Sequence, residues 1–419
     1  MMAQAFYTGI TGIQSNQVAI DVVSDNLSNI STIGYRGSEY EFSSMFESMI
    51  HTSTGTTSSN SSIGVGAQVN STRLIQTNGS LLLSDKSTDL AIDGDGWFGV
   101  QGDGEPVYTR DGNFSFDANH DLVNLDGFYV LGTMGGNIEG DILTHTLDEV
   151  ELGEVTAQEK LRFPKFLVYP PEPTTLASFI GNIGIDDEMR TMGAGVVDPL
   201  NNKNHLKLTF TKSAEQPDLG TAWDIVATTG SLDGETIYDT KTGTVNFSSS
   251  GALISNTLTT IDNNGSEVTI DLGDEFNGVI ATSNMDITSS SIADGTIGGD
   301  LLGYDINRNA EVIATFSNGM QSSVGKLAVF HFQNDQGLER LNGSKFTESS
   351  NSGKPIFFRD ASGQNIIGTN VVNFKLEDSN IEMSYGLTEL IILQRSYDAN
   401  SKSITTADQM MQKALNMDA

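Results

Sequence analysis

Cysteine is absent from this chain of 419 residues, and proline is scarce. Without thiols the protein can form neither disulfides nor thiolate metal sites, and it has no cysteine nucleophile. Only 8 prolines accompany 44 glycines, a balance that favours β-structure with many tight turns over a helical bundle. At this length we expect two to four domains rather than one core.

Positive charge is also scarce. The chain has 22 Lys and Arg against 54 Asp and Glu, a formal net charge of −32. We therefore expect no nucleic-acid partner and no anionic membrane surface, because both need clustered positive charge. The apolar run Leu390–Leu393, among the longest, is too short to enter a membrane as a span. The N-terminal residues lack the basic start and apolar core of a secretory signal peptide. Both a cytoplasmic protein and one exported without a cleaved signal fit this pattern.

No motif predicts an enzyme, a cofactor or a metal site. The segment Gly94–Gly99 satisfies G-x-G-x-x-G, but it continues as strand and turn instead of opening a helix, so we interpret it as a turn. The segment Asp117–Phe128 starts like a calcium loop but has Leu122 where glycine is needed and Phe128 where glutamate is needed. The histidines lack ligand spacing and are His51, His120, His145, His205 and His331.

Apolar residues recur every seven positions at both ends of the chain, which predicts two long helices with coiled-coil-like faces. The N-terminal row is Phe6, Ile13, Ile20 and Leu27, with a partner row of Ile10, Gln17 and Ser24. The C-terminal row is Met383, Leu390, Tyr397, Ile404 and Met411, with a partner row of Leu387, Gln394, Ser401, Asp408 and Leu415. Half-polar rows predict weak seams. We expect these termini to be largely disordered in the monomer and to fold against neighbours; an amphipathic helix lying on its own domain is the alternative for the N-terminus.

Between the termini, short apolar segments alternate with turn signals. Asn-Gly and Asp-Gly pairs occur at 78, 93, 103, 111 and 126 and favour hairpins. The stretch His51–Gly66 is rich in Ser, Thr and Gly and predicts a loop or a mobile hairpin. The predicted fold is multidomain α+β, with paired terminal helices and two antiparallel β domains of barrel or sandwich type, the outer inserted in the inner. The predicted boundaries are 1–33 with 375–419 for the helices, 34–70 with 360–374 for a connector, 71–137 with 296–359 for the inner β domain, and 138–295 for the outer β domain.

Three separated segments, in order, resemble the bacterial flagellar axial proteins of the rod and hook family. They are "DVVSDNLSNISTIGYRGSEYEF" near the start, "TDLAIDGDGWFGVQ" in the first β region, and "SNIEMSYGLTELIILQRSYDANSKSITTADQMMQKAL" at the end. The resemblance spans roughly residues 1–135 and 296–419. The family pattern falls on Asn26, Asn29, Gly34, Tyr35, Gln394, Arg395, Tyr397, Ala399, Asn400 and Ile404. This chain has Asn78-Gly79 where the family commonly has Gln-Gly.

The resemblance implies assembly into a helical homopolymer, with the terminal helices as an inner tube and the β domains as an outer shell. It implies export through the flagellum's own secretion channel to an extracellular position. Partners would then be rod and hook–filament junction proteins, the cap and the export machinery. The large inserted region favours a hook subunit, part of a curved flexible tube that passes motor torque to the filament. A distal rod protein and a secreted β-rich binding or adhesin protein are the alternatives.

Overall fold

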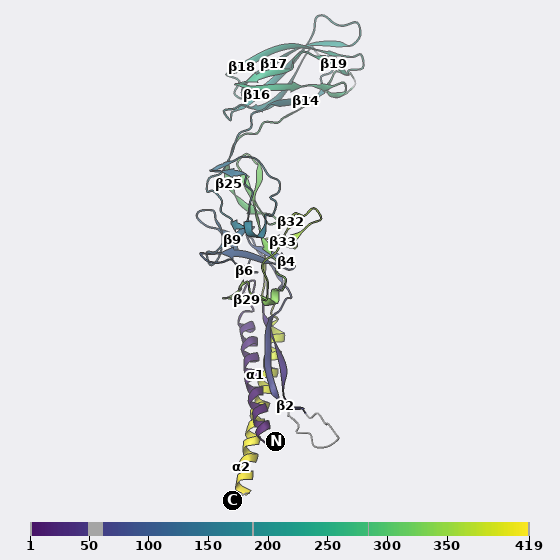
Figure 1. Cartoon of the computed structure of the whole chain (residues 1–419). Helices are drawn as coiled ribbons and strands as arrows, with labels where there is room; N and C mark the ends of the chain where they lie inside the picture. The colour runs from purple at the N-terminus through teal and green to yellow at the C-terminus, as the bar shows by residue number, and fades with distance from the viewer. Residues whose placement is uncertain (1, 49–61, 187, 284, 418–419) are drawn as a thin grey trace.

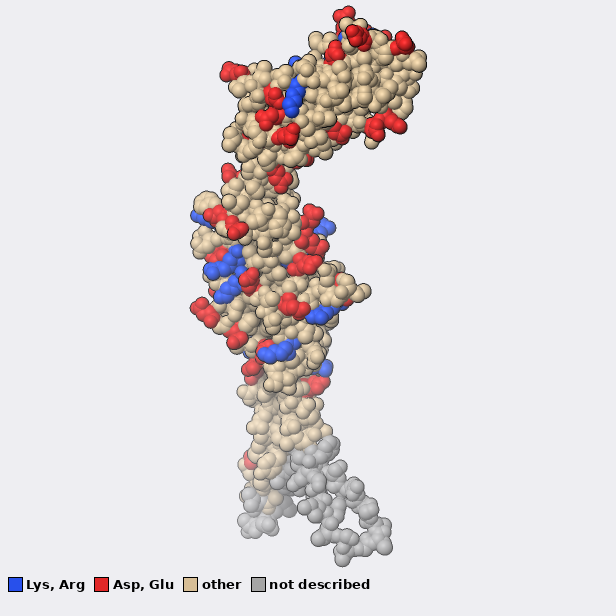
Figure 2. All heavy atoms as spheres, turned by 45° about the horizontal axis from the view of Figure 1, so that its top comes forward, with Lys and Arg blue, Asp and Glu red and all other residues tan. Residues whose placement is uncertain are grey.

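The computed structural model of the chain is elongated, with both termini at the same end (Figure 1). It describes residues 2–48, 62–186, 188–283 and 285–417. Two long helices and a β-hairpin form a stalk, and two β-rich parts follow it one after the other along the molecule. The predicted combination of two terminal helices with a mostly β body is confirmed. Figure 2 shows charged side chains on both β parts, whereas the visible face of the stalk is largely without charge.

The helices of the stalk are α1 (Met2–Ser28) and α2 (Met383–Met417). Neither contains proline, and they run antiparallel, with Leu27 beside Gly386 at one end and Gly9 beside Ile404 at the other. Both are helical in the single chain, in contrast to the expected disorder of the monomer. Their shared core is thin, with Ala19, Val23 and Leu393 buried. No helix in the described ranges is long and apolar enough to span a membrane.

The third element of the stalk is an antiparallel hairpin that lies along α1. Its strands are β1 (Ser38–Ser48) and β2 (Ser62–Leu74), and register shifts between Glu41 and Phe42 and between Met45 and Phe46 interrupt their pairing. Of the Ser/Thr/Gly-rich stretch predicted as a loop or mobile hairpin, 51–61 lies outside the described residues, and 62–66 belong to β2 of the hairpin. The segment predicted as a connector from 34 therefore contains this hairpin.

The inner β part (about residues 76–173 and 297–380) is built on a 15-stranded sheet that is antiparallel except where β11 pairs with β13. Its main path is β10 (Ile138–Glu139), β11 (Ile142–Leu143), β13 (Val168–Tyr169), β25 (Gly299–Ile306), β26 (Glu311–Phe316), β27 (Gln321–Leu327), β9 (Tyr129–Met134), β5 (Trp97–Gln101), β6 (Val107–Thr109), β30 (Lys345–Thr347) and β29 (Glu339–Arg340). Branching strands are β12 (Glu159–Lys160), β28 (Val329–Phe330), β7 (Phe114–Phe116) and β8 (Leu122–Asn124). Two 3₁₀ turns are Val155–Ala157 and Asp335–Gly337.

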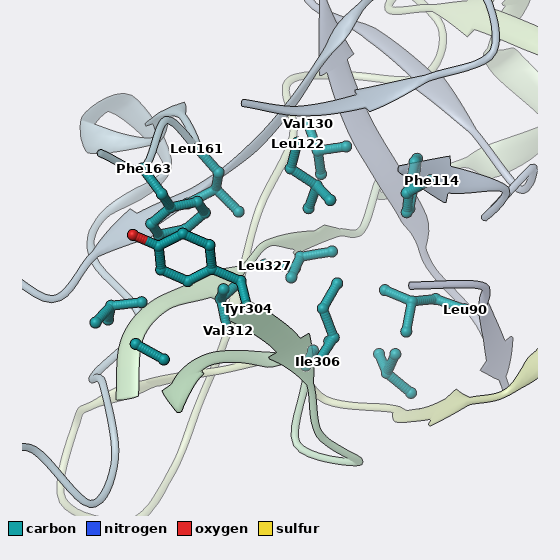
Figure 3. Packing of buried hydrophobic residues seen from close by; sticks show 14 of the residues in the cluster. Leu90, Phe114, Leu122, Val130, Leu161, Phe163, Tyr304, Ile306, Val312 and Leu327 are labelled. Carbon is teal, nitrogen blue, oxygen red and sulfur yellow. The ribbon is translucent and has the colours of Figure 1, made fainter. Parts of the chain in front are cut away.

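The inner core includes residues that follow the predicted boundary at 138. Leu161 and Phe163 are buried, and the Phe163 ring lies 5.1 Å from that of Tyr304 (Figure 3). Strand β13 pairs with β25 at the neck below the outer part. The boundary at 138 is therefore corrected to about 174, because the segment between these positions completes the inner sheet instead of starting a new core.

The returning chain also belongs to the inner β part. Strand β33 (Asn370–Asn373) pairs with β4 (Leu90–Asp93), and β34 (Lys375–Glu377) pairs with β3 (Leu81–Leu83). A further hairpin joins β31 (Phe358–Arg359) to β32 (Asn365–Ile366). Residues 360–374, predicted as connector, and the start of the segment predicted as helix at 375 thus belong to the inner β part, which is a second correction.

The outer β part (about residues 174–296) packs two sheets around one core. A five-stranded antiparallel sheet contains β15 (Met189–Val197), β16 (Lys203–Lys212), β17 (Thr221–Ser231), β18 (Ile237–Phe247) and β19 (Leu253–Asn256). A six-stranded sheet contains β20 (Thr260–Asn263), β21 (Ser266–Asp271), β14 (Leu176–Asn182), β23 (Asn277–Ile280), β22 (Gly273–Asp274) and β24 (Thr288–Ala293). In β16 buried and exposed residues alternate, as expected when one face of a strand is covered. The six-stranded sheet is mixed, since β14 runs parallel to β21 and β23, and this corrects the expectation of purely antiparallel sheets.

Two of the five predicted hairpin turns join directly paired strands. Asp103-Gly104 lies between β5 and β6, and Asp126-Gly127 lies between β8 and β9, with Gly127 at φ 78°. The pairs at 78, 93 and 111 do not join neighbouring strands of a hairpin, so the hairpin prediction is wrong there. The segment after Asp117 is an acidic turn in which the Asp117 carboxylate accepts hydrogen bonds from the backbone of Asn119 and Asp121.

Candidate assembly site

The two helices of the stalk approach closely through glycine. A Cβ atom at Gly9 would lie 2.6 Å from Cγ1 of Ile404, and one at Gly12 would lie 2.6 Å from Nδ2 of Asn400. Along α1 the buried row continues through Asn16, Ala19, Val23 and Asn26. Small side chains let the helix backbones come together, while the few larger apolar residues supply the burial.

The contact row of α2 consists of Gly386, Leu393, Asn400 and Ala407, supported by Leu390 and Ile404. The first predicted row of α2 is thus partly correct, because Leu390 and Ile404 are half-buried beside α1. The predicted partner row is wrong for the contact within the chain, since Leu387, Gln394 and Asp408 are exposed. The predicted row is displaced from the contact row by one residue. The contact row contains glycine, asparagine and alanine, and a search for bulky apolar residues does not detect these residue types. The spacing Gly386, Leu393, Asn400, Ala407 was the available signal.

The predicted assembly residues fall into three groups by exposure. The half-buried group is Phe6, Ile10, Ile13, Ile20, Leu27, Leu390, Asn400 and Ile404. The exposed group is Met383, Leu387, Gln394, Arg395, Tyr397 and Met411. The buried group is Asn26, Gly34 and Tyr35. Leu415 lies within α2, but its side chain is outside the described part of the structure.

The buried group does not form an outward surface. The Asn26 amide donates to the carbonyl of Ser38 at 2.7 Å and accepts from its N–H at 2.9 Å, so it fixes the start of β1 against the end of α1. The Tyr35 hydroxyl donates to Oδ2 of Asp25 at 2.9 Å. Burial raises the pKa of Tyr35, so this hydroxyl keeps its proton. These residues thus fix a joint inside the chain, between the end of α1 and the start of β1, and their part in contacts between subunits stays a prediction.

Gly34 occupies the tightest position of this joint. Its φ of 65° lies in the left-handed region, and a Cβ atom there would lie 2.3 Å from the backbone nitrogen of Asp111. Its N–H donates to the carbonyl of Glu377 at 2.8 Å. The turn after α1 is therefore held against both a loop of the inner β part and the strand that leads to α2.

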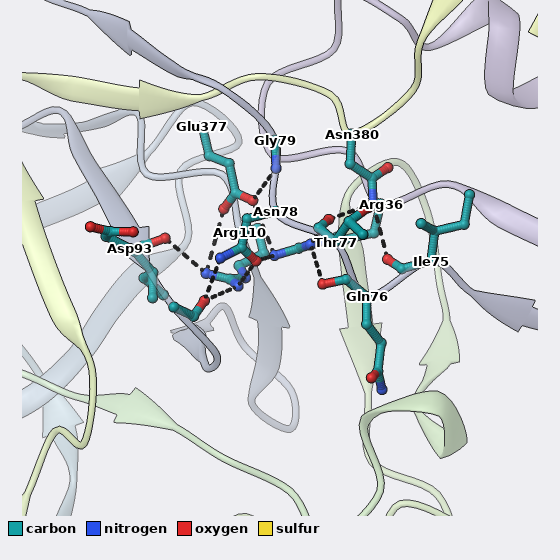
Figure 4. A network of polar contacts seen from close by, with 12 residues as sticks. Arg36, Ile75, Gln76, Thr77, Asn78, Gly79, Asp93, Arg110, Glu377 and Asn380 are labelled. Carbon is teal, nitrogen blue, oxygen red and sulfur yellow. Dashed lines mark hydrogen bonds and ion pairs between the residues drawn. The ribbon is translucent and has the colours of Figure 1, made fainter. Parts of the chain in front are cut away.

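A buried ion network completes the joint (Figure 4). The Glu377 carboxylate lies 3.0 Å from the Arg36 guanidinium and 3.4 Å from that of Arg110, and all three side chains are at most 4% exposed. Asn78 Oδ1 accepts from Arg36 at 2.7 Å and from Arg110 at 3.1 Å, and the Gly79 N–H donates to Glu377 at 3.0 Å. Burial lowers the pKa of Arg110 to about 10 and lowers that of Arg36.

The network connects four segments that are far apart in the sequence. Arg36 follows α1, Asn78 lies between β2 and β3, Arg110 follows β6, and Glu377 ends β34 before α2. Charge-assisted hydrogen bonds inside a low-dielectric site are stronger than neutral hydrogen bonds or exposed contacts. In addition, the Tyr40 hydroxyl donates to Oε1 of Glu389 at 2.8 Å and ties the hairpin to α2. The arrangement ties both stalk helices and the hairpin to the inner β part.

Three family models match the chain in sequence order. Residues 6–36 match the model described as flagella basal body rod protein, 91–162 match the flagellar hook protein FlgE/F/G D1 domain, and 374–417 match the flagellar basal body rod FlgEFG protein C-terminal. Full-length similarity extends across the chain: it is 26% identical to the flagellar hook protein FlgE of Borreliella burgdorferi, with 99% of this chain and 100% of that protein covered. These matches and the full-length similarity indicate a flagellar hook protein. The match to the D1 model continues to 162, beyond the boundary predicted at 138.

Other hook-family relatives cover the chain to the same extent. The chain is 27% identical to the FlgE protein of Brucella suis, over 98% of each, and 25% identical to that of Escherichia coli, over 99% of this chain and 100% of that protein. The crystal structure of the Helicobacter pylori flagellar hook protein FlgE2 aligns with a TM-score of 0.54 at 16% identity, covering 71% of this chain and 100% of that one. That likeness concerns the fold alone.

Proposed function

We propose that this chain is the structural subunit of a flagellar hook, which self-assembles into a curved, flexible tube and passes torque from the rod to the filament. The observation that carries the proposal is the joint: helices suited to packing with other helices are fixed by buried ion pairs to a β body. Polymerisation through the helices would transmit torque through the joint to the shell of the tube. The similar proteins belong to a structural family, not to an enzyme family.

In the proposed tube, each part of the molecule lies in a different layer. The stalk helices form the inner tube, the hairpin is the connector, and the inner and outer β parts form successive shells. The exposed predicted residues of α2, among them Gln394 and Tyr397, are available to neighbouring subunits. Rod and junction proteins, the cap and the export machinery would be further partners, and export through the flagellar channel would place the tube outside the cell.

Labelling of isolated flagella with attached basal bodies tests the location. We expect gold-labelled antibody against residues 200–260, within the outer β part, to decorate the short curved segment between rod and filament. Antibody against the filament subunit serves as the control and should begin beyond that segment. Gold confined to the rod would contradict the hook assignment in favour of a rod protein, and label away from flagella on expressing cells would favour a secreted binding protein.

Substitution of polar residues on α2 tests the mechanical part of the proposal. Gln394 is exposed and Ser401 is half-buried, and both lie on the row displaced from the contact with α1. We expect Gln394→Leu with Ser401→Leu to yield tubes that bend less, because well-packed apolar interfaces adopt discrete geometries and deform poorly. Curvature and persistence length are measured by electron microscopy. Gln321→Leu, at an exposed site on β27, is the control; unchanged bending in the α2 variant would contradict the mechanism.

A further inference from the structure

The Asn78-Gly79 pair contacts all three charged side chains of the ion network (Figure 4). An asparagine followed by glycine is chemically labile, because no side chain on the glycine hinders the attack of its nitrogen on the asparagine amide carbon. This attack closes a five-membered succinimide ring and releases ammonia. Two kinds of group accelerate such a reaction: a base that accepts the proton of the attacking nitrogen, and donors that stabilise the negative charge on the attacked oxygen.

Glu377 is placed to accept the proton of the Gly79 nitrogen. Its Oε1 accepts a hydrogen bond from the Gly79 N–H at 3.0 Å, within the reach that a general base needs. Its Oε2 is buried and accepts no hydrogen bond in the described part of the chain, although it lies 3.4 Å from the Arg110 guanidinium. The position of the attacking nitrogen requires glycine, since a Cβ atom at residue 79 would lie 1.9 Å from the carbonyl oxygen of Asp378.

Arg36 and Arg110 are placed to stabilise negative charge on the amide oxygen of Asn78. Their guanidinium nitrogens lie 2.7 Å and 3.1 Å from Oδ1, which are the distances typical of donors in an oxyanion hole. Both side chains are at most 4% exposed, so water screens their charge little. The pair therefore has both kinds of accelerating group in contact with its reacting atoms.

We propose that the folded chain modifies itself at this pair, converting Asn78 to aspartate or isoaspartate through a succinimide. The Gly79 nitrogen bonds to Cγ of Asn78 while its proton passes to Glu377. The bond from Cγ to Nδ2 then breaks, and Nδ2 leaves as ammonia after it takes up the proton from Glu377 through solvent water. A water molecule adds to one of the two carbonyl carbons of the ring and opens it, which leaves a carboxylate and a proton.

Solvent reaches Asn78, as the proposed reaction requires. The residue is exposed, although the charged side chains that it contacts are buried. Its Nδ2 donates to the carbonyl of Gly94 at 3.2 Å, and this contact is itself exposed to solvent. Water can therefore carry the proton to the departing nitrogen, remove the ammonia and hydrolyse the ring.

The reaction depends on folding and changes the charge of the joint. Glu377 is 298 positions from Gly79 in the sequence, so the base reaches the nitrogen only when the inner β part has formed. Before the reaction, Arg36 and Arg110 share the ion-paired carboxylate of Glu377. Afterwards a second carboxylate lies beside them, which completes the neutralisation of two buried cations.

Rates of deamidation at two Asn-Gly pairs of the same chain test the proposal. Asn342-Gly343, between β29 and β30, is the internal control, because both residues are exposed and, within the described ranges, neither the Asn342 side chain nor the Gly343 N–H makes a hydrogen bond. In the folded chain we expect Asn78 to convert at least about tenfold faster than Asn342. In concentrated urea the two rates should agree within about threefold, because unfolding removes the base and the donors.

Peptide mapping by mass spectrometry measures both rates in the full-length chain, as a gain of about 1 Da and the appearance of isoaspartate. Complete conversion of Asn78 in freshly purified chain, with Asn342 intact, would support the proposal in the same way. Conversion of Asn78 at or below the rate of Asn342 in the folded chain would overturn it, because the contacts with Glu377 and the arginines would then only hold the pair in place.

Substitution of the base tests its role. Glu377→Gln keeps an oxygen for the Gly79 N–H but accepts no proton, so conversion of Asn78 should slow at least about tenfold while that of Asn342 is unchanged. Glu154→Gln, in an exposed ion pair, is the matched control and should change neither rate. An unchanged rate at Asn78 in folded Glu377→Gln would refute the assignment of the base.

The pH dependence of the unaltered chain gives the same test without a change that could disturb folding. At Asn342 the rate should rise in proportion to hydroxide concentration, because hydroxide removes the proton there. At Asn78 it should rise less steeply, because the carboxylate of Glu377 removes the proton. Equal slopes at the two positions would contradict the proposal.

Discussion

Gly34→Ala should detach α1 from the inner β part. The new Cβ atom would lie 2.3 Å from the backbone nitrogen of Asp111, and neither backbone can retreat without breaking the hydrogen bond between the Gly34 N–H and the Glu377 carbonyl. Loss of a joint of this kind is expected to cost more than about 4 kcal/mol of local stability, because a backbone overlap adds to the strain of a left-handed alanine. Amide hydrogen exchange of the turn and of Tyr35 measures the effect, and polymerisation should fail with it.

Alanine substitution at a second glycine distinguishes the cost of the backbone overlap at Gly34 from the cost of the left-handed backbone conformation. Gly136 has a φ of 67°, nearly that of Gly34, but a Cβ atom there meets nothing within 4 Å. Gly136→Ala should therefore cost only about 1–2 kcal/mol, which is the price of the left-handed conformation itself. Similar losses in the two variants would show that the contact with Asp111 is unimportant. The outer β part has its own core, so its unfolding transition should be unchanged in both variants.

The sequence was sufficient to predict structure that depends on local periodicity. Seven-residue recurrence identified both helices of the stalk, and Asp-Gly pairs identified the turns at 103 and 126, since these features are determined by neighbours in the chain. The contact between the helices was displaced by one residue. Gly9, Gly12 and Gly386 make that contact by having no side chain, and a hydrophobic pattern gives such residues no weight.

The joint could be predicted only in part. Gly34 and Tyr35 stood out through a resemblance of motif, but their role inside the chain did not, because their partners Asp111 and Arg340 are distant in sequence. The ion network had no sequence signal, as Arg36 and Glu377 are more than 300 residues apart and no periodicity links them. For the same reason the sequence placed residues 360–374 in the connector, although β33 is paired with β4 across a similar separation.

Glu377→Gln should be the most destabilising change of a single charge in the joint. It keeps an oxygen for the Gly79 N–H but leaves Arg36 and Arg110 buried without a counter-charge at 3.0 and 3.4 Å. Removing one partner from a buried ion pair typically costs about 3–5 kcal/mol, because the remaining charge stays desolvated. Calorimetry of the full-length chain should show the transition of the inner β part at lower temperature, with that of the outer part unchanged.

An exposed ion pair provides the matched control. Glu154 lies 3.0 Å from Arg359, and both side chains are more than half exposed. Glu154→Gln should therefore lower the free energy of unfolding by less than about 1 kcal/mol. A double-mutant cycle of Glu377→Gln with Arg110→Met then distinguishes the effect of buried charge on stability from the effect of side-chain packing. If desolvated charge is the cause, Arg110→Met should recover part of the stability lost in Glu377→Gln, because one uncompensated cation is removed. If the two losses simply add, the network acts by packing and the polar joint has no special electrostatic role. Recovery would instead mean that stalk and β body are held in one relative orientation by neutralised charge, as transmission of torque through the subunit requires.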